Sequence, residues 1–251
     1  MTEEYGLTCL KQELLLASLV EPVEKDILIV VHDELEYVQC TIESVQRNTK
    51  NYNIYIWDNG SEEETASYLR EVAEAADNIH LHREEENLGF IIPNNRLIEK
   101  TSSPYIILLN SDCRVYEGWD TAMIGWLHSY PNTAQVGYMG GHLNKDGKGV
   151  RFNCGKDIMY VGGYCFCIER ETYDEFGLFD EENLQFAYCE DSDYSLRLQE
   201  AGRDIYALYV RLVHHFENKT VLNVLAKRDL SAELANNSVY IQSRWGNLLK
   251  D

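Results

Sequence analysis

The sequence predicts an α/β fold in which a mainly parallel central sheet is flanked by helices and followed by a C-terminal helical tail. Two observations carry this prediction. From residue 26 onward, apolar runs of strand length alternate with segments whose apolar residues recur every three to four positions, a pattern typical of successive βαβ units. The 251 residues include 45% hydrophobic and 25% charged residues, the composition of a globular chain that buries a core.

The alternation is clearest in the first half of the chain. Ser61 followed by Glu64 predicts a capping box at the start of the second helix. Pro93 fits the first turn of the third helix, where a missing N–H group is tolerated. The expected order is a strand at 27–31, a helix around 35–45, a strand at 53–57, a helix around 66–76, a weaker strand at 79–81, a helix at 90–99 and a strand at 105–109.

The second half has a looser pattern. Residues 137–152 are rich in glycine and predict a loop or hairpin, and residues 158–168 predict a strand. Residues 190–201 place apolar side chains on one helical face and predict the last core helix. We expect residues 1–25 to form a helical extension and residues 220–251 a polar helical tail.

The charge of the chain limits its partners. Asp and Glu number 42 against 22 Lys and Arg, for a net charge of -20. Such a chain repels phosphate backbones and anionic lipid headgroups, so we expect no nucleic acid partner. A bound phosphate group would need a divalent cation or backbone amides beside it.

Cysteine usage and hydropathy indicate a cytoplasmic location. The seven cysteines show no C-x-x-C spacing, which favours a reducing compartment. The first 24 residues are too acidic for a signal peptide. No apolar run approaches the roughly 18 residues of a membrane span, so we expect no integral membrane segment.

Polar residues follow two of the predicted strands directly. Asp58 and Asn59 come after the strand at 53–57, and Asn110-Ser111-Asp112 comes after the strand at 105–109. In an open parallel sheet, ligands bind beyond the carboxyl ends of the strands. Each group alone could equally be a turn or a helix cap; together they predict one crevice that presents carboxylates.

A third polar group, Glu190-Asp191-Ser192-Asp193, begins the last core helix. Acidic residues in a first turn complement the helix dipole. Three carboxylates within four residues also repel one another. One or two would be enough to complement the helix dipole. The sequence therefore predicts a catalytic base or a metal neighbourhood here.

The order and context of these groups resemble the family 2 inverting glycosyltransferases of the GT-A fold, in the rhamnosyltransferase-like branch. The resemblance covers about residues 26–246. It rests on the stretches IVVHDELEYVQCTIESV, IYIWDNGS, NLGFIIPNN, YIILLNSD, GLFDEENLQFAYCEDSDYSLRLQEAG, VHH and RWG. It implies a Rossmann-like GT-A catalytic domain over residues 26–219, with a nucleotide-sugar-binding half (26–112) and an acceptor-side half (113–219).

For the donor, the resemblance implies a site built from the first half of the chain. It assigns to this site His32, Asp58, Asn59, Asn87, Gly89, Asn95, Asn110, Ser111 and Asp112. Asp58 is expected to contact the base or ribose, and Asp112 to bind Mn²⁺ or Mg²⁺ at the donor diphosphate. Asn110 stands at the first acidic position of the family's D-x-D element, so metal binding rests on Asp112. The second ligand is expected to be His214, or His215 if the register is shifted by one residue.

On the acceptor side, the resemblance implies catalysis by the pair Glu190-Asp191. Asp191 would take the proton of the acceptor hydroxyl while this hydroxyl attacks the anomeric carbon. Gly162 and Gly163 are expected to let the acceptor sugar approach the backbone. Asp193 is also assigned to the acceptor side, where it supports the loop.

The expected function is that of an inverting glycosyltransferase, which uses a UDP-, dTDP- or GDP-linked sugar and a divalent cation to extend a glycan or glycoconjugate, in surface glycan synthesis. Two alternatives are a non-catalytic sugar-nucleotide-binding module of the same fold and a nucleotidyltransferase; no G-x-G-T-R-like loop follows the first strand to support the latter. A dinucleotide dehydrogenase needs G-x-G-x-x-G where this chain has DELEY. A glycoside hydrolase would need neither metal nor nucleotide.

Overall fold

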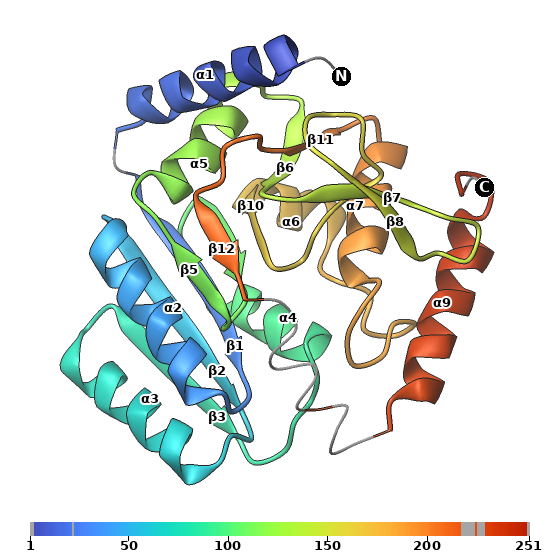
Figure 1. Ribbon diagram of the computed structural model, residues 1–251. Helices are drawn as coiled ribbons and strands as arrows, with labels where there is room; N and C mark the ends of the chain where they lie inside the picture. Colours follow the sequence, from blue (N-terminus) through green and yellow to red (C-terminus); the bar gives the residue numbers. More distant parts are fainter. Residues whose placement is uncertain (1–2, 22, 217–223, 225–228, 250–251) are drawn as a thin grey trace.

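The computed structural model of the chain describes residues 3–21, 23–216, 224 and 229–249 (Figure 1). Its centre is a seven-stranded sheet with the strand order β11-β6-β10-β4-β1-β2-β3. These strands are β1 (Lys25–Val31), β2 (Tyr52–Asn59), β3 (Ile79–Glu84), β4 (Tyr105–Leu109), β6 (Thr133–Gly137), β10 (Cys165–Glu169) and β11 (Asp204–Ala207). All neighbouring pairs are parallel except those that β10 makes with β4 and β6. The predicted mainly parallel sheet is confirmed.

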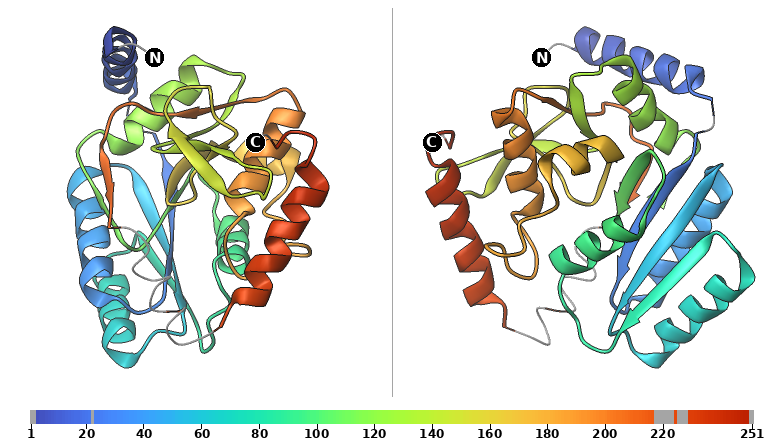
Figure 2. Two further views of the ribbon diagram at one scale, coloured as in Figure 1. Left: turned by 45° about the vertical axis from the view of Figure 1, so that its right-hand side comes forward. Right: turned by 180° about the vertical axis from the view of Figure 1, so that it is seen from behind.

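Helices cover both faces of this sheet (Figures 1 and 2). One face packs against α2 (Leu35–Asn48), α3 (Glu63–Ala75) and α5 (Trp119–Ser129), and the other against α4 (Ile91–Lys100), α6 (Arg170–Phe176) and α7 (Glu190–Glu200). Ile27 and Ile29 of β1 join the first core, and Leu28 between them joins the second. Because both faces are covered, β1 is apolar from Ile27 to Val31, and this run lacks the polar alternation of a half-exposed strand.

Two smaller sheets accompany the central one within the described residues. β5 (Cys113–Val115) pairs antiparallel with β12 (Val213–His215). β7 (Gly140–Leu143) pairs antiparallel with both β8 (Gly149–Asn153) and β9 (Tyr160–Val161). The β7–β8 hairpin lies within the glycine-rich stretch that predicted a loop or hairpin.

The single strand predicted over residues 158–168 is wrong. The chain forms β9 in the small sheet, turns at residues 162–164 and enters the central sheet as β10. Gly162 donates its N–H to the carbonyl of Met139 at 2.8 Å, and the carbonyl of Tyr164 accepts the N–H of Asn110 at 2.8 Å. The backbone of this turn is thus bonded to two different segments, and an unbroken strand could not serve both.

The capping box predicted for α3 is also wrong. The helix begins after Glu62, whose N–H donates to the Asp33 carboxylate at 2.7 Å. Ser61 does not cap the helix, because its hydroxyl accepts the N–H of Asp33 at 3.0 Å. The cap therefore comes from the loop after β1, 29 positions away, where no local pattern reveals it. Pro93 does lie in the first turn of α4, as predicted.

The N-terminal extension is a helix that packs onto the body of the protein. α1 (Glu3–Leu19) lies beside α5 (Figures 1 and 2). Glu13 is fully buried and accepts hydrogen bonds from the Tyr206 hydroxyl at 3.0 Å and from the N–H groups of Tyr209 and Val210 at 3.0 and 2.9 Å. Burial raises the pKa of Glu13, while these three bonds oppose the rise. They join α1 to β11 and to the segment that follows it.

The C-terminal helix α9 (Ser231–Trp245) forms part of the predicted tail. Residues 220–223, 225–228 and 250–251 of that prediction lie outside the described residues. α9 runs beside α7 (Figures 1 and 2). Within the described part of the chain, none of the helices has the length and apolar character that crossing a bilayer would require.

Candidate functional site

Polar residues at the carboxyl ends of the central strands line one cavity. It lies beyond the ends of β1, β2 and β4, the edge at which parallel sheets place their ligands. Seven residues predicted for the donor site line it, namely His32, Asn59, Asn87, Gly89, Asn110, Ser111 and Asp112. Residues 186–188, which lead to α7, form another wall.

Asp58 and Asn95 were predicted for the donor site and lie outside this cavity. Asp58 is fully buried, forms an ion pair with Arg83 and accepts the N–H of Ser61 at 3.0 Å. Arg83 stands directly opposite Asp58 in the β2–β3 ladder. This carboxylate is engaged within the sheet, and the contact between Asp58 and the base or ribose stays a prediction.

Asn95 fixes a different segment. Its side chain donates to the carbonyl of Phe179 at 3.0 Å and to the carboxylate of Glu181 at 2.9 Å, and it accepts the N–H of Phe179 at 3.0 Å. The residue is buried. These bonds hold the chain between α6 and α7 against α4, and the nucleotide contact of Asn95 stays a prediction.

Asn59 shapes the floor of the cavity. Its amide group donates to the Asn87 side chain at 2.8 Å and to the carbonyl of Gly89 at 2.7 Å, and its oxygen accepts the N–H of Leu88 at 2.9 Å. The carbonyl of Asn59 also lies 2.9 Å from Nδ1 of His32. The end of β2, the end of β1 and the loop before α4 are thereby held in one arrangement.

Gly89 permits a close backbone approach between the two walls. Its φ is +85°, and a Cβ at this position would lie 2.4 Å from the carbonyl oxygen of Phe186. That oxygen accepts the N–H of Phe90 at 2.6 Å. Phe186, Tyr188 and Cys189 themselves have φ values of 62°, 68° and 73°, unusual for side-chain-bearing residues and typical of functional sites.

We expect Gly89→Ala to destabilise the protein by about 1–3 kcal/mol, since alanine is strained at this φ and its Cβ meets backbone. The measurement is the free energy of unfolding in urea. Gly202→Ala is the matched control, because Gly202 has φ +79° and nothing within 4 Å of its Cβ position. An equal loss in the two variants would show that the wall at Phe186 moves away at no cost.

Asp112 and His215 form the part of the site that is suited to a metal ion. Nε2 of His215 lies 3.0 Å from Oδ1 of Asp112. Candidate ligand atoms of Asp112, Cys113 and His215 all lie within 4.8 Å of one another. Burial raises the pKa of the Cys113 thiol well above its usual value, and hard cations such as Mn²⁺ and Mg²⁺ prefer oxygen donors to thiol sulfur. A carboxylate oxygen and an imidazole nitrogen remain as donors.

His215 replaces His214, the predicted metal ligand, as the neighbour of Asp112. His214 is exposed, and its ring packs edge-on against Phe216 at 4.8 Å between centroids. Successive residues of a strand alternate between faces, so one of the two histidines lies against Asp112 and the other against Phe216. Pairing of β12 with β5 places His215 opposite Cys113 and therefore on the side of Asp112.

Asn110 contributes an acceptor without a partner. Its Oδ1 is buried and has no hydrogen-bond partner among the described residues. Its Nδ2 lies 3.5 Å from Nε2 of His215. Buried polar atoms are nearly always satisfied, so the orphaned oxygen favours a ligand or cation at this point, beside Asp112.

The predicted catalytic pair begins α7. Asp191 is partly buried; it accepts the N–H of Gly163 at 2.9 Å and, through its other oxygen, the N–H of Ser192 at 2.7 Å. Burial raises the pKa of Asp191, although these bonds oppose the rise. Burial and the charge of Asp191 raise the pKa of Glu190 to about 8. Oε2 of Glu190 has no hydrogen-bond partner within the described chain.

Two consecutive residues join the metal-suited group to this pair. Gly163 bonds to Asp191, and the ring of the next residue, Tyr164, stacks on that of His215 with 4.7 Å between centroids and a 5° interplanar angle. The carbonyl of Tyr164 also accepts the N–H of Asn110. The turn between β9 and β10 therefore fixes Asp191 and His215 relative to each other.

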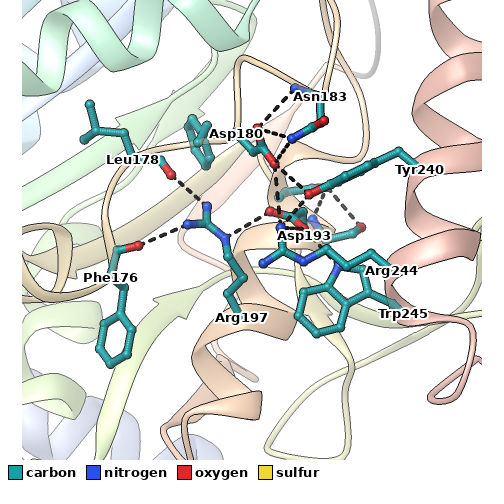
Figure 3. A network of polar contacts seen from close by, with 12 residues as sticks. Phe176, Leu178, Asp180, Asn183, Asp193, Arg197, Tyr240, Arg244 and Trp245 are labelled. Carbon is teal, nitrogen blue, oxygen red and sulfur yellow. Dashed lines mark hydrogen bonds and ion pairs between the residues drawn. The ribbon is translucent and has the colours of Figure 1, made fainter.

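Asp193 anchors the C-terminal helix (Figure 3). Its carboxylate accepts Nε of Arg197 at 3.0 Å and Nε1 of Trp245 at 2.9 Å, and Arg244 lies 3.7 Å away. Arg197 also donates to two carbonyls of the segment before α7 (Figure 3). These contacts hold the segment before α7 and the C-terminal helix together, and the acceptor-side position of Asp193 stays a prediction.

Gly162 packs against Met139. A Cβ there would lie 2.5 Å from the side chain of Met139, so this glycine serves the tight turn after β9. Gly163 differs, because its N–H bonds directly to the Asp191 carboxylate.

Asn237 of α9 contacts the cavity wall and was not predicted. The side chain is fully buried, donates to the carbonyls of Gln185, Ala187 and Tyr188 at 2.8, 3.0 and 3.1 Å, and accepts the N–H of Gln185 at 2.8 Å. It thus holds the residues with positive φ in place. Asn237, Ile241 and Trp245 follow one another at intervals of four residues and therefore share one face of a helix. This spacing could have predicted that Asn237 is buried.

Comparison with known proteins decides the family. The family model described as "Glycosyl transferase family 2" matches residues 26–173, and that described as "Glycosyltransferase like family 2" matches residues 153–231. The chain belongs to glycosyl transferase family 2. The match over residues 26–173 includes the cavity-lining residues from Val30 to Asp112. The match over residues 153–231 includes the Glu190-Asp191 pair and His215.

One curated relative of this family 2 chain is Glycosyltransferase AglE from Haloferax volcanii, 29% identical over 96 residues. The match covers 37% of this chain and about a third (32%) of that relative's length.

Two solved structures share the fold. GalNAc-T7 with UDP, GalNAc and Mn²⁺ has a TM-score of 0.68 at 15% identity. The match covers 86% of this chain and 52% of the GalNAc-T7 chain. The mannosyltransferase PcManGT from Pyrobaculum calidifontis, in complex with GDP-Man and Mn²⁺, has a TM-score of 0.61 at 11% identity. The match covers 98% of this chain and 79% of the PcManGT chain. The predicted GT-A architecture of this family 2 chain is confirmed.

Proposed function

We propose that the chain is an inverting glycosyltransferase that moves a sugar from a nucleotide diphosphate to a hydroxyl of a glycan or glycoconjugate. The observation that carries the proposal is the turn Gly163-Tyr164, which contacts Asp191 on one side and His215 on the other. A base for the acceptor and a cation site for the donor diphosphate are thus built against each other.

The donor end of the site suits Mn²⁺ or Mg²⁺. The Asp112 carboxylate and Nε2 of His215 would hold the ion, with the unpartnered Oδ1 of Asn110 beside them; oxygen and imidazole donors fit these cations. When bound, the cation neutralises the diphosphate and the charge that develops on the leaving nucleotide. In a chain of net charge -20, such neutralisation is needed for phosphate to bind.

At the acceptor end, Asp191 would act as the general base. The N–H groups of Gly163 and Ser192 orient its carboxylate, and its raised pKa makes it a stronger base than an ordinary aspartate. It would remove the proton of the acceptor hydroxyl as this oxygen attacks the anomeric carbon on the face opposite the leaving diphosphate. Such a displacement inverts the anomeric configuration.

The solved structures of similar fold support a nucleotide-sugar donor, since one holds UDP with GalNAc and the other GDP-Man, each with Mn²⁺. UDP-, dTDP- and GDP-linked sugars remain the proposed donors. All seven cysteines are free, which supports a reducing, cytoplasmic location. We further propose residues 26–219 as the catalytic domain, with α1 and α9 packed onto it, acting in surface glycan synthesis.

The nucleotide is identified by calorimetric titration of UDP, GDP and dTDP, each with and without Mn²⁺. We expect one nucleotide to bind with a Kd that rises when the metal is removed. The physical reason is that Asp112 and the diphosphate repel each other unless a cation lies between them. Absence of binding by all three, in a protein shown to be folded, would contradict the proposed function.

A further inference from the structure

A second cleft lies on the far side of the Asp112–His215 pair. We name it the Arg211 cleft, and it is lined by Tyr116, Met139, Tyr164, Arg211, Val213, His214 and His215. It runs along β12, and it shares no lining residue with the donor-side cavity. Since Asp112 lines that cavity and His215 lines the cleft, the two spaces meet at this pair.

The cleft differs from the rest of this acidic protein in its charge. No carboxylate lines it. Arg211 donates to the Cys154 sulfur at 3.9 Å, and in the part of the chain that the structure describes it forms no ion pair. Burial raises the pKa of the Cys154 thiol, so the sulfur is neutral and leaves the guanidinium charge uncompensated.

The other arginines that flank the site are neutralised. Arg83 pairs with Asp58, Arg96 with Glu181 and Arg197 with Asp193. Arg211 is exposed. The guanidinium of Arg211 lines the same cleft as Tyr164 and His215. Its charge therefore acts on the cleft.

Resting on the function proposed above, we propose that the Arg211 cleft binds an oxyanion carried by the acceptor, a phosphate or a carboxylate. The guanidinium fork matches either group with two parallel hydrogen bonds. The exposed Tyr116 lines the same cleft as Arg211, and a tyrosine ring offers an apolar face with a polar tip. The acceptor class is thus an anionic glycan or glycoconjugate, whose attraction to Arg211 reverses the repulsion of the surrounding charge.

The chemistry requires the charge to be at one end of the acceptor and the reacting hydroxyl at the other. Tyr164 lines the cleft, and its chain neighbour Gly163 bonds to Asp191. An acceptor held at Arg211 would therefore pass Tyr164 on its way to the proposed base. The anion itself takes no part in bond making or breaking.

The test measures binding of three probes by calorimetry: glucose 1-phosphate, glucuronate and uncharged glucose. We expect at least one anionic probe to bind better than glucose, and Arg211→Gln to weaken that binding by about tenfold or more, as the loss of hydrogen bonds to a charged group does. Arg211→Lys, which keeps the charge and loses the fork, should retain part of the affinity. The anionic probe whose binding Arg211→Gln weakens more shows whether the oxyanion is a phosphate or a carboxylate.

Arg114→Gln is the matched control, because Arg114 lies on the neighbouring strand β5, is exposed and contacts Cys40 rather than the cleft. It should leave probe binding unchanged. Three results would each overturn the proposal: no anionic probe binds, both arginine variants weaken binding equally, or Arg211→Gln weakens nucleotide binding as much as probe binding. Nucleotide titration of the same variants with Mn²⁺ shows separately whether the proposed function itself fails.

Discussion

Replacing Asp191 with asparagine is expected to lower the rate of sugar transfer by about 10²–10⁴-fold, the range that a general base contributes. Asparagine keeps one of the two oxygens that accept hydrogen bonds from Gly163 and Ser192, but it cannot take up the acceptor proton. The nucleotide should bind unchanged, because Asp191 does not line the donor-side cavity. The measurements are kcat from release of the nucleotide diphosphate and the nucleotide Kd.

Glu190→Gln is the matched control. A carboxyl whose pKa is about 8 is protonated at pH 7, and glutamine preserves that neutral state. We expect its loss of rate at pH 7 to be at least about tenfold smaller than that of Asp191→Asn. A loss as large as that of Asp191→Asn would contradict the assignment of the base. Normal turnover by Asp191→Asn would contradict it too and would favour a non-catalytic binding module.

The pH profile follows from the same assignment. The base must be ionised, so kcat/KM should fall as the pH falls through the pKa of Asp191. Because burial raises this pKa, the acid limb of the wild-type profile should lie above the value of about 3.9 of an ordinary aspartate. An acid limb at or below that value would argue against a buried aspartate as the base.

The second large effect is expected at the metal-suited pair. His215→Ala and Asp112→Asn should each weaken Mn²⁺ binding in the presence of the bound nucleotide by about 100-fold, the upper end of what loss of a supporting group costs. The reason is that each removes one of the two donors placed 3.0 Å apart. Electron paramagnetic resonance titration of Mn²⁺ measures this affinity.

His214→Ala separates the two registers of the histidine pair. The exposed His214 ring packs on Phe216, away from Asp112, so its removal should leave Mn²⁺ affinity unchanged. Greater weakening by His214→Ala than by His215→Ala would contradict the site described above and restore the register expected from the family.

Much of the fold could be predicted because its causes are local. β4 was predicted with its observed bounds, 105–109, because a strand buried on both faces is a continuous apolar run bounded by polar residues. The second half was harder. α5 carries apolar residues on all sides, with Ala122, Met123, Ile124 and Trp126 all buried, so its sequence lacks the one-sided periodicity that identifies a helix.

The candidate site was predicted at the level of segments. Polar residues directly after strands indicated the edge of the sheet, and the cavity is there. The cap of α3 by Asp33 and the contacts of Asn237 with residues 185–188 were not predictable in this way. Both join segments distant in the chain, and hydrogen bonds between distant segments leave no periodic pattern in the sequence.

The sequence by itself determined the alternation of strands and helices, the position of the polar segments at strand ends and the acidic start of α7. The tertiary structure decided which member of each adjacent pair faces the site: Asn59 rather than Asp58, and His215 rather than His214. The physical reason is that neighbouring residues of a strand point to opposite faces. Which face meets the site depends on ladder partners, Arg83 for Asp58 and Cys113 for His215, that only the folded chain brings together.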